Sequence, residues 1–264
     1  MRPPKGDIFA PEFPPGLPWI NSEPQTLRLC SGHPFLIEFW DFCRANSIRT
    51  LPYIRGWHER YGPDGLAVIG VHSAGFDPSA DPENVRAAVR RLRIEHPVVV
   101  DVDHVIWRTY ENLGWPARYL FNGAAALHHY HYGEGGYDET ELAIQELLGV
   151  QQPLLQPVRP EDAPGALLEA QTDDVPGPYT GTYEAGGVWA VLEGRGTATA
   201  FGRRITVRHP GVYELISHPE STRGVVDLRL GAGVRCVAVC FTPGLAGPGV
   251  QGRAQARRRA RRAG

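Results

Sequence analysis

The sequence predicts an α/β domain with a mixed β-sheet flanked by helices, followed by a smaller β-rich domain. Up to about residue 150, short apolar runs alternate with amphipathic segments, which is the pattern of strands and helices packed in layers. From residue 178 the pattern changes to short alternating strands, separated by turn residues at intervals of about ten. This second pattern is typical of a small β-sandwich or jelly roll.

Five segments follow from these changes in pattern. We expect an irregular proline-rich segment at 1–24, the α/β domain at 25–150, a linker at 151–177, the β-rich domain at 178–245 and a disordered basic tail at 246–264. The linker contains five prolines and no periodic apolar pattern. A chain of 264 residues has room for one large domain or two modest ones.

The first domain has the predicted order β-α-β-α-β-α-β-β-α, after a short strand at 26–29. Asp81 and Pro82 mark the start of its second helix, because an acid is a common N-cap and proline fits the first turn. Asn122-Gly123 joins the last two strands as a hairpin. The strands are predicted at 35–40, 66–71, 97–100, 117–121 and 125–132, and the helices at 45–60, from 81, at 103–110 and at 139–148.

The second domain contains five segments with alternating apolar residues. They lie at 187–192, 204–208, 211–216, 224–230 and 234–241. Cys236 and Cys240 would share one face of the last strand, about 13 Å apart at a rise of about 3.3 Å per residue. That separation is too long for a disulfide, so we expect two buried apolar cysteines.

The composition excludes several classes of protein. The formal net charge is −2, but six arginines lie beyond residue 250, so the rest of the chain is more acidic and argues against a specific nucleic-acid partner. The sequence has no P-loop, nucleophile elbow or paired C-x-x-C metal site, so no cofactor is predicted. It shows no signal peptide and no run long enough to span a membrane. We therefore expect a cytoplasmic protein whose cysteines are thiols; its oligomeric state stays open.

The stretch 35–53 carries the most specific pattern. An apolar run leads through a turn into a helical segment that contains a proline. It resembles the active-site segment of thioredoxin-like proteins of the TlpA/DipZ type, which read roughly F-W-T-Y-x-C-x-x-C-x-R-x-L-P-Y. The matching residues are Phe39, Trp40, Arg49, Leu51, Pro52 and Tyr53. Further similar motifs extend the resemblance over about residues 10–150, and they imply a thioredoxin-like sheet and thiol–disulfide exchange with a protein or peptide partner.

The two cysteines of that motif are replaced. In the matching register the nucleophilic cysteine falls on Arg44 and the resolving cysteine on Ser47, while Cys43 stands one residue too early. Two hypotheses follow. In the first, the protein is at most a one-cysteine redox protein that acts through Cys43. In the second, it is a redox-inactive module that binds a peptide or protein in the groove beside Pro116.

Cys43 is the candidate nucleophile. It precedes a helix N-terminus and adjoins Arg44, and both features lower the pKa of a thiol. A single reactive cysteine could form a mixed disulfide or a sulfenic acid. The alternative is a small buried residue in a motif that has lost its chemistry.

The resemblance implies roles for three more residues. Trp115 and Pro116 would bind substrate, with Pro116 in a cis peptide bond that faces the active site. Glu38 occupies the place of the buried acid below the cysteine pair. A buried carboxyl group with a raised pKa could accept a proton, or it could be a paired structural acid.

Two further polar groups have open interpretations. Arg44, Asn46, Ser47 and Arg49 form a polar first turn that could bind an anion or simply cap the helix. His128, His129 and His131 lie on one strand, and His129 and His131 share a face, as two metal ligands might. No carboxylate or cysteine stands at a suitable spacing, so we expect exposed histidines and no metal.

Overall fold

The computed structural model describes residues 8–27 and 32–247. Within it the chain divides into two compact units, Met1–Gln156 and Pro157–Gly264. The strand predicted at 26–29 falls partly outside the described residues, and so does most of the predicted basic tail. Each unit has its own sheets and its own apolar core.

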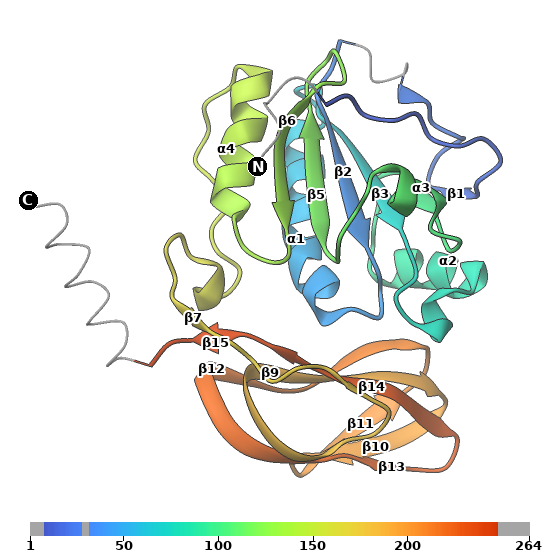
Figure 1. Ribbon diagram of the computed structural model, residues 1–264, viewed down its shortest axis with the longest axis vertical. Coiled ribbons are helices and arrows are strands. Elements are labelled where there is room, and N and C mark those ends of the chain that lie inside the picture. The colour runs from blue at the N-terminus through green and yellow to red at the C-terminus, as the bar shows by residue number, and fades with distance from the viewer. Residues whose placement is uncertain (1–7, 28–31, 248–264) are drawn as a thin grey trace, which may run out of the picture. The chain divides into compact units, whose positions relative to one another are not determined.

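The first unit is built on a six-stranded mixed sheet in the order β1-β4-β3-β2-β5-β6 (Figure 1). The three central strands β2, β3 and β4 are parallel, and β1, β5 and β6 each run antiparallel to their neighbour. The bounds are β1 Trp19–Ile20, β2 Phe35–Trp40, β3 Ala67–His72, β4 Val98–Val100, β5 Ala117–Phe121 and β6 Leu127–Tyr132. This is the mixed sheet with a closing hairpin that the sequence predicts.

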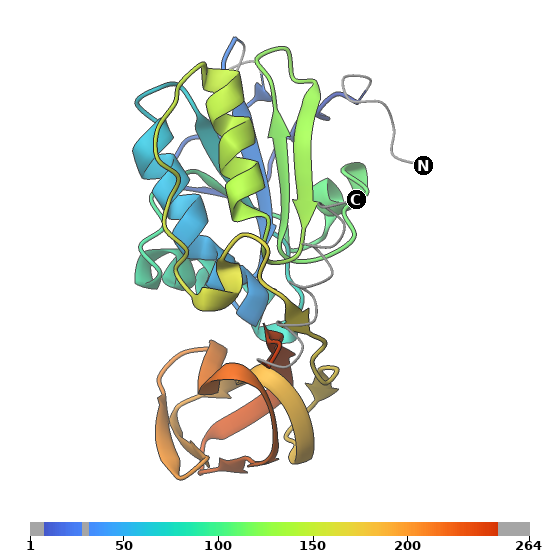
Figure 2. The ribbon, with the colours of Figure 1, turned by 90° about the vertical axis from the view of Figure 1, so that its left-hand side faces the viewer.

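Two helices cover one face of this sheet, α1 (Ala45–Tyr61) and α4 (Tyr137–Leu148), as Figure 2 shows. Leu36 and Leu120 of the sheet pack there against Ile54, Trp57 and Ile144 of the two helices. The other face packs against the N-terminal segment and α3 (Val105–Thr109), in a core whose members include Phe35, Ile37, Phe39, Val71, Ile106 and Phe13. Successive side chains of β2 point to opposite faces, so this strand contributes to both cores.

The starts of the helices follow from their sequences. Asp81 caps α2 (Pro82–Arg91) by accepting a hydrogen bond from the N–H of Glu83, and proline occupies the first position as expected. Pro52 lies inside α1 with its side chain exposed. Since proline has no N–H, α1 lacks one backbone hydrogen bond at that turn.

The N-terminal segment differs from the irregular chain expected at 1–24. Trp19 and Ile20 form β1 and pair with Val99 and Val98 at one edge of the sheet. Upstream, Phe9 bridges to Ala126 beside the start of β6. A two-residue strand leaves no periodic pattern in the sequence, so only its pairing partner identifies it.

The second unit consists of antiparallel sheets. One has the order β12-β9-β14-β8 and another the order β11-β10-β13, while β15 pairs with β7. The two larger sheets share one apolar core. The bounds are β7 Leu168–Glu169, β8 Val175–Pro176, β9 Thr180–Gly194, β10 Gly196–Ala200, β11 Arg203–Val207, β12 Gly211–Asp227, β13 Arg229–Leu230, β14 Val234–Thr242 and β15 Gly244–Leu245.

These strands differ from the predicted ones in three ways. The predicted strands at 211–216 and 224–230 are largely one long strand, β12, whose register shifts twice where it pairs with β9. The strand β10 was not predicted, and the stretch predicted as a linker contains the short strands β7 and β8. The sandwich or jelly-roll arrangement stays a prediction.

The two cysteines of β14 do not share a face, contrary to the prediction. The register of β14 against β9 shifts between Cys236 and Ala238. Such a β-bulge inserts one residue and reverses the alternation beyond it. Cys236 accordingly lies in the apolar core of the unit with Val239 and Phe241, whereas Cys240 is buried outside that cluster.

Among the residues that the structure describes, no helix is both long enough and apolar enough to cross a membrane.

Candidate functional site

The loop between β2 and α1 is organised by the buried carboxylate of Asp41. Its Oδ1 accepts a hydrogen bond from the N–H of Cys43 at 2.8 Å. Its Oδ2 accepts from the N–H of Gly75 at 2.8 Å and from Ser79 Oγ at 3.1 Å. His72 Nε2 lies 3.6 Å from the Oδ1 atom. One carboxylate therefore ties the loop before α1 to the loop after β3, at the end of the sheet where the sequence places the active-site motif.

Cys43 and Ser47 are both fully buried. Ser47 Oγ accepts a hydrogen bond from the N–H of Asp41 at 3.2 Å, so the residue in the place of the resolving cysteine helps to hold this loop. The N-cap of α1 is Arg44, whose side chain makes no capping bond. The predicted capping by Asn46 or Ser47 is therefore wrong, because both residues lie inside the helix and the Ser47 hydroxyl turns toward the loop.

Arg44, in the place of the nucleophilic cysteine, is held between two aromatic rings. Its Cζ lies 4.6 Å from the ring centre of Phe76 and 4.5 Å from that of Trp115, which are cation–π distances. Its Nε is buried, and no hydrogen-bond acceptor for it lies among the described residues. A Cβ on Gly75 would come within 2.8 Å of this Nε, so glycine is needed for the close approach. Because the first turn of α1 contains no acid, the positive end of the helix adds to the charge of Arg44.

Trp115 and Pro116 lie beside this arginine. The peptide bond between them is cis. Trp115 donates from Nε1 to the carbonyl of Ser73 at 2.9 Å, and its ring centre lies 4.2 Å from that of Trp107 in α3. The Trp115 ring is therefore fixed from two sides, and it presents a rigid surface to the guanidinium of Arg44.

Glu38 lies in a separate polar cluster on the face of β2 covered by α1. It stands opposite Arg118 in the pairing of β2 with β5, and both residues are buried. Neither carboxyl oxygen has a hydrogen-bond partner among the described residues. Burial raises the pKa of Glu38 to about 8, although the charge of Arg118 acts in the opposite direction. Glu38 is therefore largely protonated at neutral pH.

Arg118 stays charged in this cluster. Burial lowers its pKa to about 10, which still leaves it protonated at neutral pH. Its guanidinium lies 4.8 Å from the ring centre of Tyr137, and its Nη2 donates to the carbonyl of Gly135. Arg49 reaches the same turn and pairs with Glu134 at 2.8 Å. The glycine-rich turn between β6 and α4 thus accepts contacts from two arginines.

The side chain of Trp40 is fully buried, so it does not form part of the protein surface. Its ring packs edge-on against His72, with ring centres 5.0 Å apart. Phe42 stacks on the same imidazole, with ring centres 5.4 Å apart. Trp40 thus has a packing role beneath the motif, and the surface beside Pro116 is formed by Arg44, Phe76 and Trp115.

Asp41, His72, Phe76 and Ser79 contribute to the site and were not predicted from the sequence. Asp41 stands where the related motif has threonine, and that replacement is the one signal in the sequence that could have found it. The other three lie on or after β3 and reach the motif only through the fold. The four residues explain how the loop keeps its shape without a cysteine pair.

The histidines of β6 are half-buried, not exposed as predicted. His128 Nε2 lies 3.2 Å from a carboxylate oxygen of Glu146, and His131 Nε2 lies 3.0 Å from the carbonyl oxygen of Glu134. Burial lowers the pKa of His131. In the part of the chain that the structure describes, no group of three or more His, Cys, Asp or Glu residues could hold a metal ion.

Curated relatives match part of the chain. Protein DipZ of Mycobacterium bovis is 34% identical over 163 residues, which are 58% of this chain and 24% of DipZ. The chain thus spans about a quarter of the length of the DipZ protein it matches. Thiol-disulfide oxidoreductase YkuV of Bacillus subtilis is 28% identical over 138 residues, which are 52% of this chain and 93% of YkuV. No model of a protein family matches the chain.

A solved structure supports the same assignment. The crystal structure of thioredoxin-like superfamily protein SPOA0173 matches 55% of this chain and 99% of its own, with a TM-score of 0.50 and 25% sequence identity. The chain therefore contains a thioredoxin-like domain of the TlpA/DipZ type.

Proposed function

We propose that this protein is a redox-inactive thioredoxin-fold module that binds an extended segment of a protein or peptide beside Pro116. The observation that carries the proposal is the position of Arg44. It replaces the nucleophile at the N-terminus of α1, and two aromatic rings hold its guanidinium. A guanidinium in this place cannot attack a disulfide, but it can bind a carboxylate.

The burial of Cys43 supports the loss of thiol–disulfide exchange. Its side chain is fully buried, and its N–H is committed to Asp41. Attack on a disulfide needs a thiolate with access to the sulfur that it attacks. YkuV is named a thiol-disulfide oxidoreductase, so in this proposal the chain keeps the fold of such a protein and loses the exchange reaction.

The chemistry of the site favours an acidic partner. The guanidinium of Arg44 and the positive N-terminal end of α1 both attract negative charge. The first turn of α1 contains no acid that would oppose this attraction. Phe76 and Trp115 add apolar surface on either side. We therefore expect an extended segment that carries a side-chain or C-terminal carboxylate next to an apolar residue.

Binding to peptide libraries tests this function. The full-length protein should select peptides with a carboxylate, and Arg44→Ala should weaken the selected peptides by about tenfold or more, as expected for a lost charge-assisted bond. Arg108→Ala provides a matched control, since Arg108 is an exposed arginine on α3. Equal affinity in the wild type and the Arg44→Ala variant would overturn the proposal.

The second candidate is a one-cysteine redox protein, favoured by the place of Cys43 next to Arg44 at the start of α1. Alkylation of Cys43 as a function of pH, in a variant with Cys30, Cys236 and Cys240 replaced, separates the two. The binding module predicts slow alkylation and unchanged peptide affinity in Cys43→Ser. Rapid alkylation well below the usual thiol pKa of about 8.5 would support the one-cysteine protein instead.

Restoring the missing pair tests the register of the motif. The double variant Arg44→Cys/Ser47→Cys should gain insulin-reducing activity that the wild type lacks, because the loop before α1 is otherwise held in place by Asp41. The single variants should not gain it. A double variant that folds but stays inactive would show that these two positions do not correspond to the cysteine pair.

A further inference from the structure

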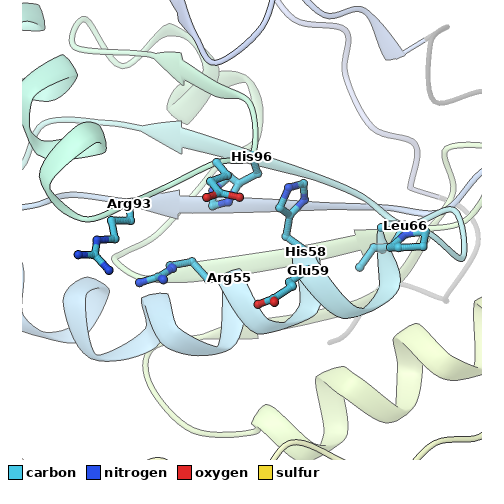
Figure 3. A pocket seen from close by; sticks show the side chains of 9 residues that line it. Arg55, His58, Glu59, Leu66, Arg93 and His96 are labelled. Atoms are coloured by element: carbon cyan, nitrogen blue, oxygen red, sulfur yellow. The ribbon is translucent and has the colours of Figure 1, made fainter.

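A second polar site lies beside the later turns of α1, within the first unit. It is a cavity of about 710 Å³, a size typical of pockets for small molecules. Its polar lining comes from α1 and from the segment that follows α2 (Figure 3). Those residues are Arg55, His58, Glu59, Arg93, Glu95 and His96.

His96 is the central residue of this lining. It is fully buried, yet neither ring nitrogen has a hydrogen-bond partner among the described residues. Its backbone is fixed, because the side chain of Asn21 donates to the His96 carbonyl at 3.0 Å. His58 Nδ1 is also buried without a partner in the described part of the chain. The two rings are 5.6 Å apart and inclined at 67°.

Buried polar atoms in proteins almost always have a partner, so such a group of exceptions needs an explanation. Burial lowers the pKa of His96 to about 3 and also lowers the pKa of His58. Both rings are therefore neutral near pH 7, and each has one N–H donor and one acceptor nitrogen. Nε2 of His96 lies against Gly70 of β3, so the atoms left for a polar molecule in the cavity are the Nδ1 atoms of His96 and His58.

The charged residues around the two rings indicate which molecule fits. Figure 3 shows Arg55 and Arg93 at one end of the cavity and Leu66 at the other, with His58 and His96 between them. Glu59 and Glu95 also line the cavity and balance the charges of Arg55 and Arg93. No third ligand is placed to complete a metal site in the described chain, which favours hydrogen bonding over coordination.

We infer that this cavity binds a small organic molecule with an oxyanion group, a carboxylate or a phosphate. The oxyanion would lie between Arg55 and Arg93 and accept from the N–H of His96, while the rest of the molecule extends past His58 toward Leu66. Arginine suits this role because its planar fork of donors matches both oxyanions. The site is independent of the surface beside Pro116.

Calorimetric titration of the full-length protein with succinate and with inorganic phosphate, at constant ionic strength, tests the inference. Saturable binding of either anion supports it, and the anion that binds identifies the class of ligand. In the double variant Arg55→Ala/Arg93→Ala the affinity should fall about tenfold or more. Arg90→Ala provides the control, because this exposed arginine of α2 does not line the cavity.

His96→Phe adds a second readout. This variant should lose binding without a lower melting temperature, because it removes two buried nitrogens that have no partner in the described chain. The wild-type melting temperature should rise with the bound anion and that of the variant should not. Absence of saturable binding by both anions, or full affinity in the arginine double variant, would overturn the inference.

Discussion

Two buried carboxyl groups, at Asp41 and Glu38, lie in the same short stretch of chain and have opposite environments. Asp41 accepts three hydrogen bonds from two loops, whereas the oxygens of Glu38 have no hydrogen-bond partner among the described residues. Both side chains are fully buried. The comparison shows that burial alone does not define the role of an acid. Asp41 organises the backbone, and Glu38 is an acid kept largely neutral by desolvation.

The largest expected effect on stability comes from replacing Asp41, the acid that organises the loop before α1. Asp41→Ala leaves the N–H groups of Cys43 and Gly75 without their acceptor, whereas the hydroxyl of Ser79 keeps the carbonyl of Phe76 at 2.8 Å. Each buried unsatisfied group costs about 1–3 kcal/mol, so the free energy of unfolding should fall by at least about 2 kcal/mol. Urea denaturation measures this. Asp103→Ala, at an exposed position, should change little, and an equally small effect at Asp41 would contradict the role assigned to it.

Glu38 should instead affect how the free energy of unfolding depends on pH. Its pKa in the folded protein, about 8, lies above its ordinary value of 4.5, so the native state holds a proton that the unfolded state has already released. Its stabilising contribution is complete below about pH 4.5 and is lost as the pH rises toward 8. The contribution of Glu38 to the free energy of unfolding should therefore decline over this range by an amount on the order of 2–4 kcal/mol, while the buried histidines with lowered pKa values act in the opposite direction.

Glu38→Gln should remove that dependence on pH, since the amide does not titrate. Denaturation at pH 5 and pH 8, compared between the wild type and the variant, measures the difference. Glu83→Gln provides the control, because Glu83 is exposed on α2 and forms only a surface ion pair with Arg86. A difference in stability between the wild type and Glu38→Gln that is the same at both pH values would show that Glu38 does not carry the proton.

The smallest effect concerns Ser47, in the first turn of α1. Ser47→Ala removes the acceptor for the N–H of Asp41 and should lower the free energy of unfolding by about 1–2 kcal/mol. Ser47→Cys should restore part of this loss, because sulfur is a weak acceptor. An alanine variant as stable as the wild type would show that the loop does not depend on this bond.

The sequence predicts much of the first unit because its signals are local. The strands at 35–40 and 117–121 and the N-cap at Asp81 follow from apolar runs and capping chemistry. The hairpin with Asn122-Gly123 is equally local. By contrast, Gly75 and Ser79 bond to Asp41 from more than thirty positions away in the sequence. No periodic pattern in the sequence predicts these two contacts.

The second unit and the cavity were harder to foresee for related reasons. The bulge in β14 moves Cys240 to the opposite face from Cys236, and nothing in the local alternation of apolar residues signals a bulge. His96 is not part of a recognisable sequence motif. It lines the cavity together with His58 and Arg55, which lie on a helix about forty residues earlier in the chain. Sites assembled from separate segments need the fold before they can be recognised.

The N-terminal segment has a consequence for association of the protein with itself. Residues 8–10 make backbone hydrogen bonds beside the start of β6, and residues 18–20 pair with β4 at the opposite margin of the sheet. A single stretch of about a dozen residues thus occupies hydrogen-bonding groups that could otherwise recruit a strand from another molecule. Proteolysis within this stretch would expose templates for intermolecular strand addition at both margins, so control of aggregation lies in the part of the domain with the least regular structure.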